Sequence, residues 1–214
     1  MALCTHRSCV IVTCALMAVA LAAPAQAQGT ADAQFVEVRG GTCSFEVDTN
    51  LPVLSVHGKS SALEGRVRVR RGTEGPVLEQ IEATVAVKSL GTGLKLRDEH
   101  MRKYVFTTGD GQVPDVRFVA GGAACAKKSA NQSTCQVTGE LTIRGTARPF
   151  TVALAVKEDG DRFHASGDGI VRLSAYGIEK PSQLGVTTSD EVKLRLEFTA
   201  RPGREVVATS GGAR

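Results

Sequence analysis

The chain has 214 residues, with 26 Lys and Arg against 22 Asp and Glu, so its formal net charge is +4 at pH 7. This near balance, with no Trp and only two Tyr to stack on bases, argues against nucleic acid as a partner. The length is sufficient for one domain with a sizeable core.

The first 27 residues have the features of a secretory signal peptide. Arg7 precedes an apolar run from Val10 to Ala23, and Ala25-Gln26-Ala27 matches the small-x-small pattern of a cleavage site. The run is shorter than the roughly 20 residues that a membrane span needs. We therefore predict a signal peptide over 1–27, no stable transmembrane anchor, and a location in the periplasm or outside the cell.

Short alternating strands dominate the chain after a flexible lead-in that we predict over residues 28–42. In these runs apolar residues occupy every second position and polar residues the positions between, which is typical of an antiparallel sheet with one apolar face. The pattern is found in the segments 66–70, 81–87, 116–120, 137–143, 150–156, 162–173 and 192–198. The last residues, 201–214, are predicted to be a disordered tail.

One segment, LKLRDEHMRKYVF at Leu94–Phe106, departs from this pattern. Asp98 is a suitable N-cap residue, and Met101, Tyr104 and Val105 fall on one helical face. We predict a single short amphipathic helix here, which packs over an opening or a flank of the sheet.

About eight strands, each with one apolar face, can close into an up-and-down barrel or pair as a sandwich. Closure into a barrel removes the exposed edges that a single open sheet would leave, so the pattern predicts a mainly β fold, with barrel and sandwich both possible at this point. Small residues at inward positions either let strands bend or leave volume for a small ligand. These are Gly139, Ala165, Gly167 and Gly169.

Three cysteines lie beyond the signal peptide: Cys43, Cys125 and Cys135. Cys125 and Cys135 bracket a polar loop between two strand-like runs, so we predict that they form a disulfide in an oxidising compartment. A bond from Cys43 to one of them is the alternative. None has a Cys or His partner at ligand spacing, so no metal site is expected.

Sequence signals of catalysis are weak. His57, His100 and His164 are the histidines beyond the signal peptide, and no Gly-x-Ser-x-Gly, His-Glu-x-x-His or phosphate-loop motif occurs. We expect no enzymatic activity and no catalytic residues.

Three segments carry recognisable motifs in a fixed order. Residues 97–118 contain R-D-x-H-M followed by P-x-x-x-F, residues 139–149 contain G-x-L-T-I-x-G-x-x-x-P, and residues 176–198 form a closing segment that begins YGI. Together they resemble the YceI-like family over about residues 43–200. One departure is the segment after Asp48, Thr49-Asn50-Leu51-Pro52, which lacks the His-Ser pair common in that family.

The resemblance implies a mainly β fold over residues 43–200, an extended lipocalin-like up-and-down antiparallel β-barrel of about eight strands with one short helix beside it. It implies a periplasmic or secreted protein. It also implies a long apolar lipid, a polyprenyl or quinone-type isoprenoid, in the barrel, and no other cofactor. Such a chain gains about 0.8 kcal/mol per buried CH₂. The residues expected to line the lumen are Val67, Val69, Ile81, Val85, Val116, Phe118, Leu141, Leu154, Phe163, Val171, Leu194 and Leu196.

Some alternatives stay open. Two roles stay open for three polar side chains of the helix segment: contact with a polar lipid head group at the mouth of the barrel, or an ordinary solvated helix surface. These side chains are Arg97, His100 and Lys103. The lining residues equally fit a filled core, and the chain would then be a structural or protein-interaction module of the envelope stress response. An enzyme or redox partner of a quinone-like lipid is a third, weaker interpretation. A homodimer is also left open.

Overall fold

The computed structural model describes residues 33–203, so the predicted signal peptide and residues 204–214 of the predicted tail lie outside the described part of the chain. The tail prediction is wrong for Arg201 and Pro202, which belong to the last strand. The elements are, in chain order, β1 (Gln34–Thr49), β2 (Ser55–Arg71), β3 (Pro76–Val85), the 3₁₀ turn η1 (Val87–Ser89), α1 (Lys95–Met101), the π-helical turn η2 (Arg102–Phe106), β4 (Val116–Ala120), β5 (Ala123–Ser129), β6 (Gln132–Ile143), β7 (Thr146–Asp159), β8 (Arg162–Arg172), the 3₁₀ turn η3 (Leu173–Tyr176), β9 (Ser182–Gln183) and β10 (Val186–Pro202).

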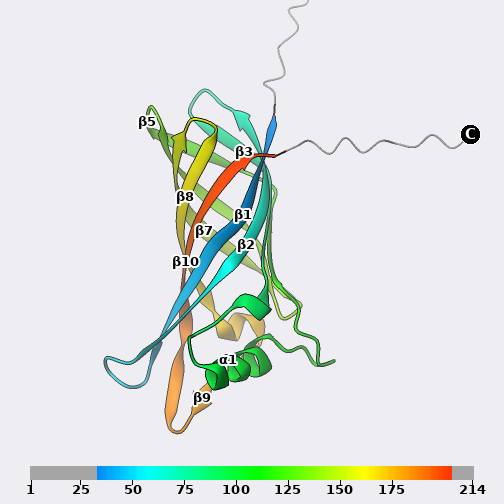
Figure 1. Cartoon of the computed structure of the whole chain (residues 1–214), viewed down its shortest axis with the longest axis vertical. Coiled ribbons are helices and arrows are strands. Elements are labelled where there is room, and N and C mark those ends of the chain that lie inside the picture. Colours follow the sequence, from blue (N-terminus) through cyan, green and yellow to red (C-terminus); the bar gives the residue numbers. More distant parts are fainter. Residues whose placement is uncertain (1–32, 204–214) are drawn as a thin grey trace, which may run out of the picture. The chain divides into compact units, whose positions relative to one another are not determined.

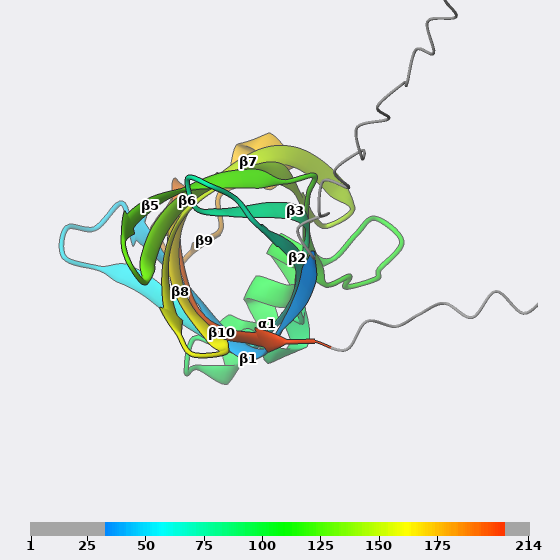
Figure 2. The same ribbon diagram turned by 90° about the horizontal axis from the view of Figure 1, so that it is seen from above.

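The strands form a closed antiparallel barrel (Figures 1 and 2). Around the ring the order is β1-β2-β3-β4-β6-β7-β8-β10, and β10 pairs with β1 to close it. The short strand β5 pairs with both β3 and β6, and β9 forms a hairpin with β10. This arrangement confirms the predicted mainly β, up-and-down barrel of about eight strands.

The first strand begins earlier than the sequence predicts. β1 starts at Gln34, so the flexible lead-in expected over 28–42 is wrong from Gln34 onward. Val36 and Val38 are buried and pair with both β2 and β10. Gly40 has a φ of 74°, and the register shifts between Val38 and Gly41. This bulge changes which alternate residues face inward, and so interrupts the pattern that marks a strand.

A single short helix and neighbouring turns cover one end of the barrel, the lower end in Figure 1. Met101 and Val105 pack against the core, and Phe106 is buried, whereas Tyr104 is exposed. The predicted N-cap is wrong, because α1 begins at Lys95 and Leu94 occupies the cap position without a side-chain hydrogen bond. Among the described residues, no helix has the length and hydrophobicity to cross a membrane.

The predicted disulfide is present between Cys125 and Cys135. The two residues are direct partners in the β5–β6 hairpin, and both are buried. Cys43 on β1 is a buried free thiol, which decides between the two pairings considered above.

Candidate functional site

The barrel interior is lined by apolar side chains from every strand of the ring. Each of the twelve residues predicted to line the lumen either belongs to one of two hydrophobic clusters or packs against one. The twelve residues share the inner face because they occupy alternate positions of their strands, and alternate side chains of a strand point to opposite faces of the sheet. The lining prediction therefore places these residues on the correct face, and their contact with a ligand stays a prediction.

The two clusters occupy different parts of the barrel. The larger one joins the helix-covered end, with Val87, Leu90 and Phe106, to the wall strands. The smaller one surrounds the Cys125–Cys135 disulfide. Apolar residues packed against both clusters connect them: Val67, Phe118, Phe150 and Leu196. The interior is therefore one continuous apolar surface.

Many inward side chains are only partly buried, although they point into a closed barrel. Among the lining residues this holds for Val67, Val69, Val116, Phe118, Leu154, Phe163, Leu194 and Leu196. Phe45 and Phe198, which sequence reasoning did not select, share this position. A fully packed core residue would be shielded on all sides, so the exposure of these side chains indicates incomplete packing of the barrel.

The inward glycines accommodate neighbouring side chains. A Cβ atom on Gly167 would lie 2.5 Å from Cδ2 of Leu154, and one on Gly169 would lie 2.5 Å from Cζ of Phe150. Gly167 and Gly169 therefore do not leave unfilled volume beside them, because a neighbouring side chain occupies that space at both positions. The side chains of Leu154 and Phe150 lie against the wall where a bulkier residue would have pushed them away.

Polar groups are few on the inner face. Ser60 and Ser133 are the buried polar residues of the described chain, and the hydroxyl groups of Ser60 and Ser89 lie 2.6 Å apart. Within residues 33–203 no group of three His, Cys, Asp or Glu side chains could hold a metal ion. The interior therefore offers apolar contact and little specific chemistry.

The three proposed head-group residues each have a partner on the surface of the α1 end. Arg97 donates hydrogen bonds from Nε to the Thr92 hydroxyl and from a terminal nitrogen to the Thr92 carbonyl, both at 2.8 Å. Nδ1 of His100 lies 3.2 Å from Oε1 of Gln183. The Lys103 ammonium group lies 5.3 Å from the centre of the Tyr104 ring. Each of the three side chains thus has a partner within the chain, and contact with a head group stays a prediction.

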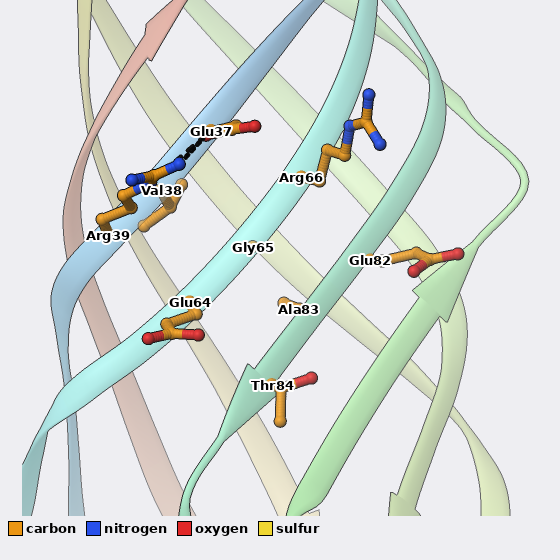
Figure 3. Close-up of a pocket in the computed structure, with 9 residues that line it drawn as sticks. All are labelled: Glu37, Val38, Arg39, Glu64, Gly65, Arg66, Glu82, Ala83 and Thr84. Carbon is orange, nitrogen blue, oxygen red and sulfur yellow. Dashed lines mark hydrogen bonds and ion pairs between the residues drawn. The ribbon is translucent and has the colours of Figure 1, made fainter. Parts of the chain in front are cut away.

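The outer wall carries the charged residues and a shallow groove across β1, β2 and β3 (Figure 3). The groove has a volume of about 300 Å³, and Gly65 lies between the charged side chains of its rim. Arg39 and Glu37 form an ion pair of 2.8 Å there. The guanidinium group of Arg66 lies 4.0 Å from the centre of the Phe35 ring on the same wall. The groove is open and highly charged, unlike the interior.

The comparison with known proteins agrees with the fold. The sequence model of the YceI-like domain family matches residues 31–200 of this chain. The chain belongs to the YceI-like family. UPF0312 proteins of Pseudomonas savastanoi pv. phaseolicola and Pseudomonas syringae pv. syringae are 26% identical to it over 129 residues, which is 58% of this chain. The match spans 62% of the length of these relatives.

Three solved structures are similar in fold to this chain. A polyisoprenoid-binding domain from Saccharophagus degradans has a TM-score of 0.59 at 12% identity, and the match covers 80% of this chain and all of that one (100%). BcnA of Burkholderia cenocepacia has a TM-score of 0.54 at 20% identity, covering 73% and 95% of the two chains. For the YceI protein of Campylobacter jejuni the TM-score is 0.55 at 17% identity, covering 72% and 90%.

Proposed function

We propose that this chain is a non-catalytic binding protein that holds an apolar lipid of the isoprenoid type inside its barrel. The observation that carries this proposal is the inner face, which is apolar apart from a few hydroxyl groups and yet incompletely packed, with Phe163, Leu194 and Leu196 partly exposed. A long hydrocarbon needs apolar area and few polar contacts. The similarity in fold to the polyisoprenoid-binding domain of Saccharophagus degradans supports the same ligand class.

The direct test is the identification of bound lipid. The protein is purified without detergent, extracted with organic solvent, and the extract is analysed by mass spectrometry. We expect a prenyl-chain lipid in a stoichiometric amount. An extract without such a lipid, together with no binding of added polyprenyl phosphate or quinone, would end the proposal.

A substitution at Leu196 separates a carrier from a filled barrel. Leu196 packs against both clusters and is partly exposed, so it lies where a lipid and a larger side chain would compete. In a carrier, Leu196→Trp fills free volume, so lipid is lost and stability is retained. In a filled barrel the same change overpacks the core and costs about 1–3 kcal/mol of unfolding free energy. Val119→Thr, on the outer wall, is the matched control.

The alternative function, a protein-interaction module with a filled barrel, has one observation in its favour. Large apolar side chains are exposed at the α1 end, among them Val53, Leu94 and Leu184. Exposed apolar residues of this kind mark interaction sites when they gather in a patch. The Leu196→Trp experiment decides between the two functions, because it reports on the interior alone.

We also propose that the protein works outside the cytoplasm. The Cys125–Cys135 disulfide supports this location, because such bonds persist in oxidising compartments. Cell fractionation and determination of the N-terminal residue of the recovered protein test it. Recovery from the cytoplasm with residues 1–27 intact would contradict both the location and the signal peptide.

A further inference from the structure

Two loop tips at the α1 end present apolar side chains to solvent. One tip connects β1 to β2 and contains Leu51, Val53 and Leu54; the other connects β9 to β10 and contains Leu184. Val53 and Leu184 are fully exposed. Neither residues 49–54 nor residues 181–186 include a charged side chain. We call these two segments the apolar tips.

Hydrogen bonds hold the apolar tips together although they lie far apart in the sequence. The side-chain amide of Asn50 donates to the carbonyl of Gly185 at 3.1 Å, and the backbone N–H of Asn50 donates to the carbonyl of Thr187 at 2.9 Å. In return, the N–H of Thr187 donates to Oδ1 of Asn50 at 2.8 Å. These bonds join the two tips into one surface, and Figure 1 shows both tips at the end of the barrel where α1 lies.

The backbone holds both exposed residues in an unfavourable conformation. Val53 has a φ of 64° and Leu184 a φ of 52°. This left-handed region is strained for a β-branched residue such as Val. At Leu184-Gly185, both with positive φ, a two-residue hairpin turn would ordinarily carry Asn-Gly. Folding alone would select a different residue at each position.

A second turn of the same chain provides an internal comparison. Arg144-Gly145 also has positive φ at both residues, but a terminal guanidinium nitrogen of Arg144 donates to the carbonyl of Gly177 at 3.2 Å. The fully exposed side chain of Leu184 offers only an apolar surface to its surroundings. An apolar side chain in this place is therefore available for an external apolar partner.

The helix extends this surface. Leu94, Leu96 and Tyr104 of the α1 region are exposed, and the His100–Gln183 contact ties α1 to β9. Lys103 lies against the Tyr104 ring. Aliphatic residues beside a Tyr and a Lys match the composition of protein segments at the boundary between lipid and water.

We propose that the α1 end of the barrel docks on a lipid bilayer, with the apolar tips inserted among the acyl chains. A bilayer fits better than a second copy of the chain. A stable protein interface needs a complementary area of about 800 Å² on each partner, whereas the apolar tips form a small protruding surface with four exposed apolar side chains, Leu51, Val53, Leu54 and Leu184. The interfacial region of a bilayer is fluid and accommodates such protrusions. Docking goes beyond the proposed function and does not require a lipid in the barrel.

A tryptophan scan tests the insertion directly, because the chain has no Trp. Leu184→Trp and Val53→Trp each place one reporter on a tip, and Val119→Trp places the control reporter on the outer wall. Vesicles of phosphatidylcholine, with or without phosphatidylglycerol, are added to the full chain as it is recovered from the cell. We expect a blue-shifted emission and quenching by brominated lipid at positions 53 and 184, but not at 119.

Other results would overturn the proposal. An unchanged emission at both tips excludes insertion, whatever the rest of the chain does. Equal shifts at all three positions indicate binding without orientation. A shift that appears without vesicles and grows with protein concentration assigns the tips to a second copy. Lipid bound in the barrel is measured separately by extraction, so failure of docking and failure of the lipid-binding proposal are distinguishable.

A second set of variants measures affinity. Val53→Asn and Leu184→Asn introduce a residue that tolerates positive φ, so the fold is retained or becomes more stable. Each substitution removes an apolar side chain that would be buried in the bilayer, so it should weaken vesicle binding roughly tenfold. The double variant should lose both contributions. Val119→Thr should leave binding unchanged. Retention of full affinity by the double variant would contradict the proposal.

Discussion

The Asp98 carboxylate accepts hydrogen bonds from both the hydroxyl group and the backbone N–H of Thr92, which fixes the turn before α1. These two bonds, with the nearby charges of Arg102 and Arg97, hold the pKa of Asp98 below its usual range, and the Thr92 hydroxyl contributes most. The ionised form is thus favoured in the folded protein.

This relationship predicts a pH dependence of stability. Because the pKa is lower in the folded state, the stabilisation is fully present above the unfolded pKa of about 3.9 and is lost as the pH falls through the folded pKa. Asp98→Ala should reduce the unfolding free energy at neutral pH by up to about 1 kcal/mol, because the carboxylate is only partly buried and solvent screens its interactions, and by less in acid. Urea unfolding of both proteins at several pH values measures the difference.

The control for Asp98 is Glu99→Gln, which removes an exposed charge from the same helix. It should change stability by less than about 0.5 kcal/mol. A destabilisation by Asp98→Ala that stays the same from neutral to acidic pH would contradict the assigned role of the carboxylate.

The departure of α1 from prediction has a physical reason in the same contact. Asp98 is a common N-cap residue type, and the sequence shows only that preference. In the structure its carboxylate reaches back six positions to Thr92, while the helix already begins at Lys95. Such a contact depends on the path of the loop, which the amino-acid pattern does not describe.

Removal of the disulfide should destabilise the barrel without changing its fold. The bond closes a short loop, so the paired variant Cys125→Ala with Cys135→Ala should lose about 2–3 kcal/mol of unfolding free energy. Chemical denaturation monitored by circular dichroism measures the loss. The wild-type chain under reducing conditions serves as the control and should unfold at a similar denaturant concentration. Equal stability of oxidised and reduced protein would contradict the prediction.

The thiol of Cys43 should be almost unreactive in the folded protein. Burial raises its pKa to about 11, and only the thiolate attacks disulfide reagents. At pH 8 we expect labelling at least about a hundredfold slower than for an exposed thiol. Ellman's reagent measures the rate, the Cys43→Ala variant gives the background, and the rate should rise on unfolding. Rapid reaction of the native thiol would show that position 43 is accessible.

Two inward glycines should respond differently to the same substitution. A Cβ atom on Gly139 would collide with the backbone carbonyl oxygen of Val119, which cannot move independently. On Gly169 it would meet the Phe150 ring, which can rotate away. Gly139→Ala should therefore cost more than Gly169→Ala, toward the upper end of the roughly 1–3 kcal/mol typical of overpacking. Thermal or urea unfolding of the pair tests the order, and the reverse order would refute it.

The wall of the barrel is predictable from sequence because a period of two maps directly onto two faces. Val67 and Leu196 are recognised as inward in this way, and both contact the core clusters. The same rule fails at Gly40, where a bulge shifts the alternation, and the first half of β1 is missed.

The apolar tips could not be predicted for a different reason. An apolar side chain is expected to be buried in the core, and the residues around Val53 or Leu184 do not show that these two side chains face solvent. Their exposure follows from positive φ angles and from the hydrogen bonds of Asn50, both of which are properties of the folded state.

The pairing of the first strand with the last has a consequence for how the molecule forms. β1 and β10 meet along most of their lengths, from Val36 opposite Pro202 to Thr49 opposite Thr188. Contacts of such high sequence separation form late and slowly, so a nascent or shortened chain would keep two unsatisfied strand edges open to aggregation. Pairing of β10 with β1 and β8 therefore removes the two open edges through which incomplete chains would aggregate.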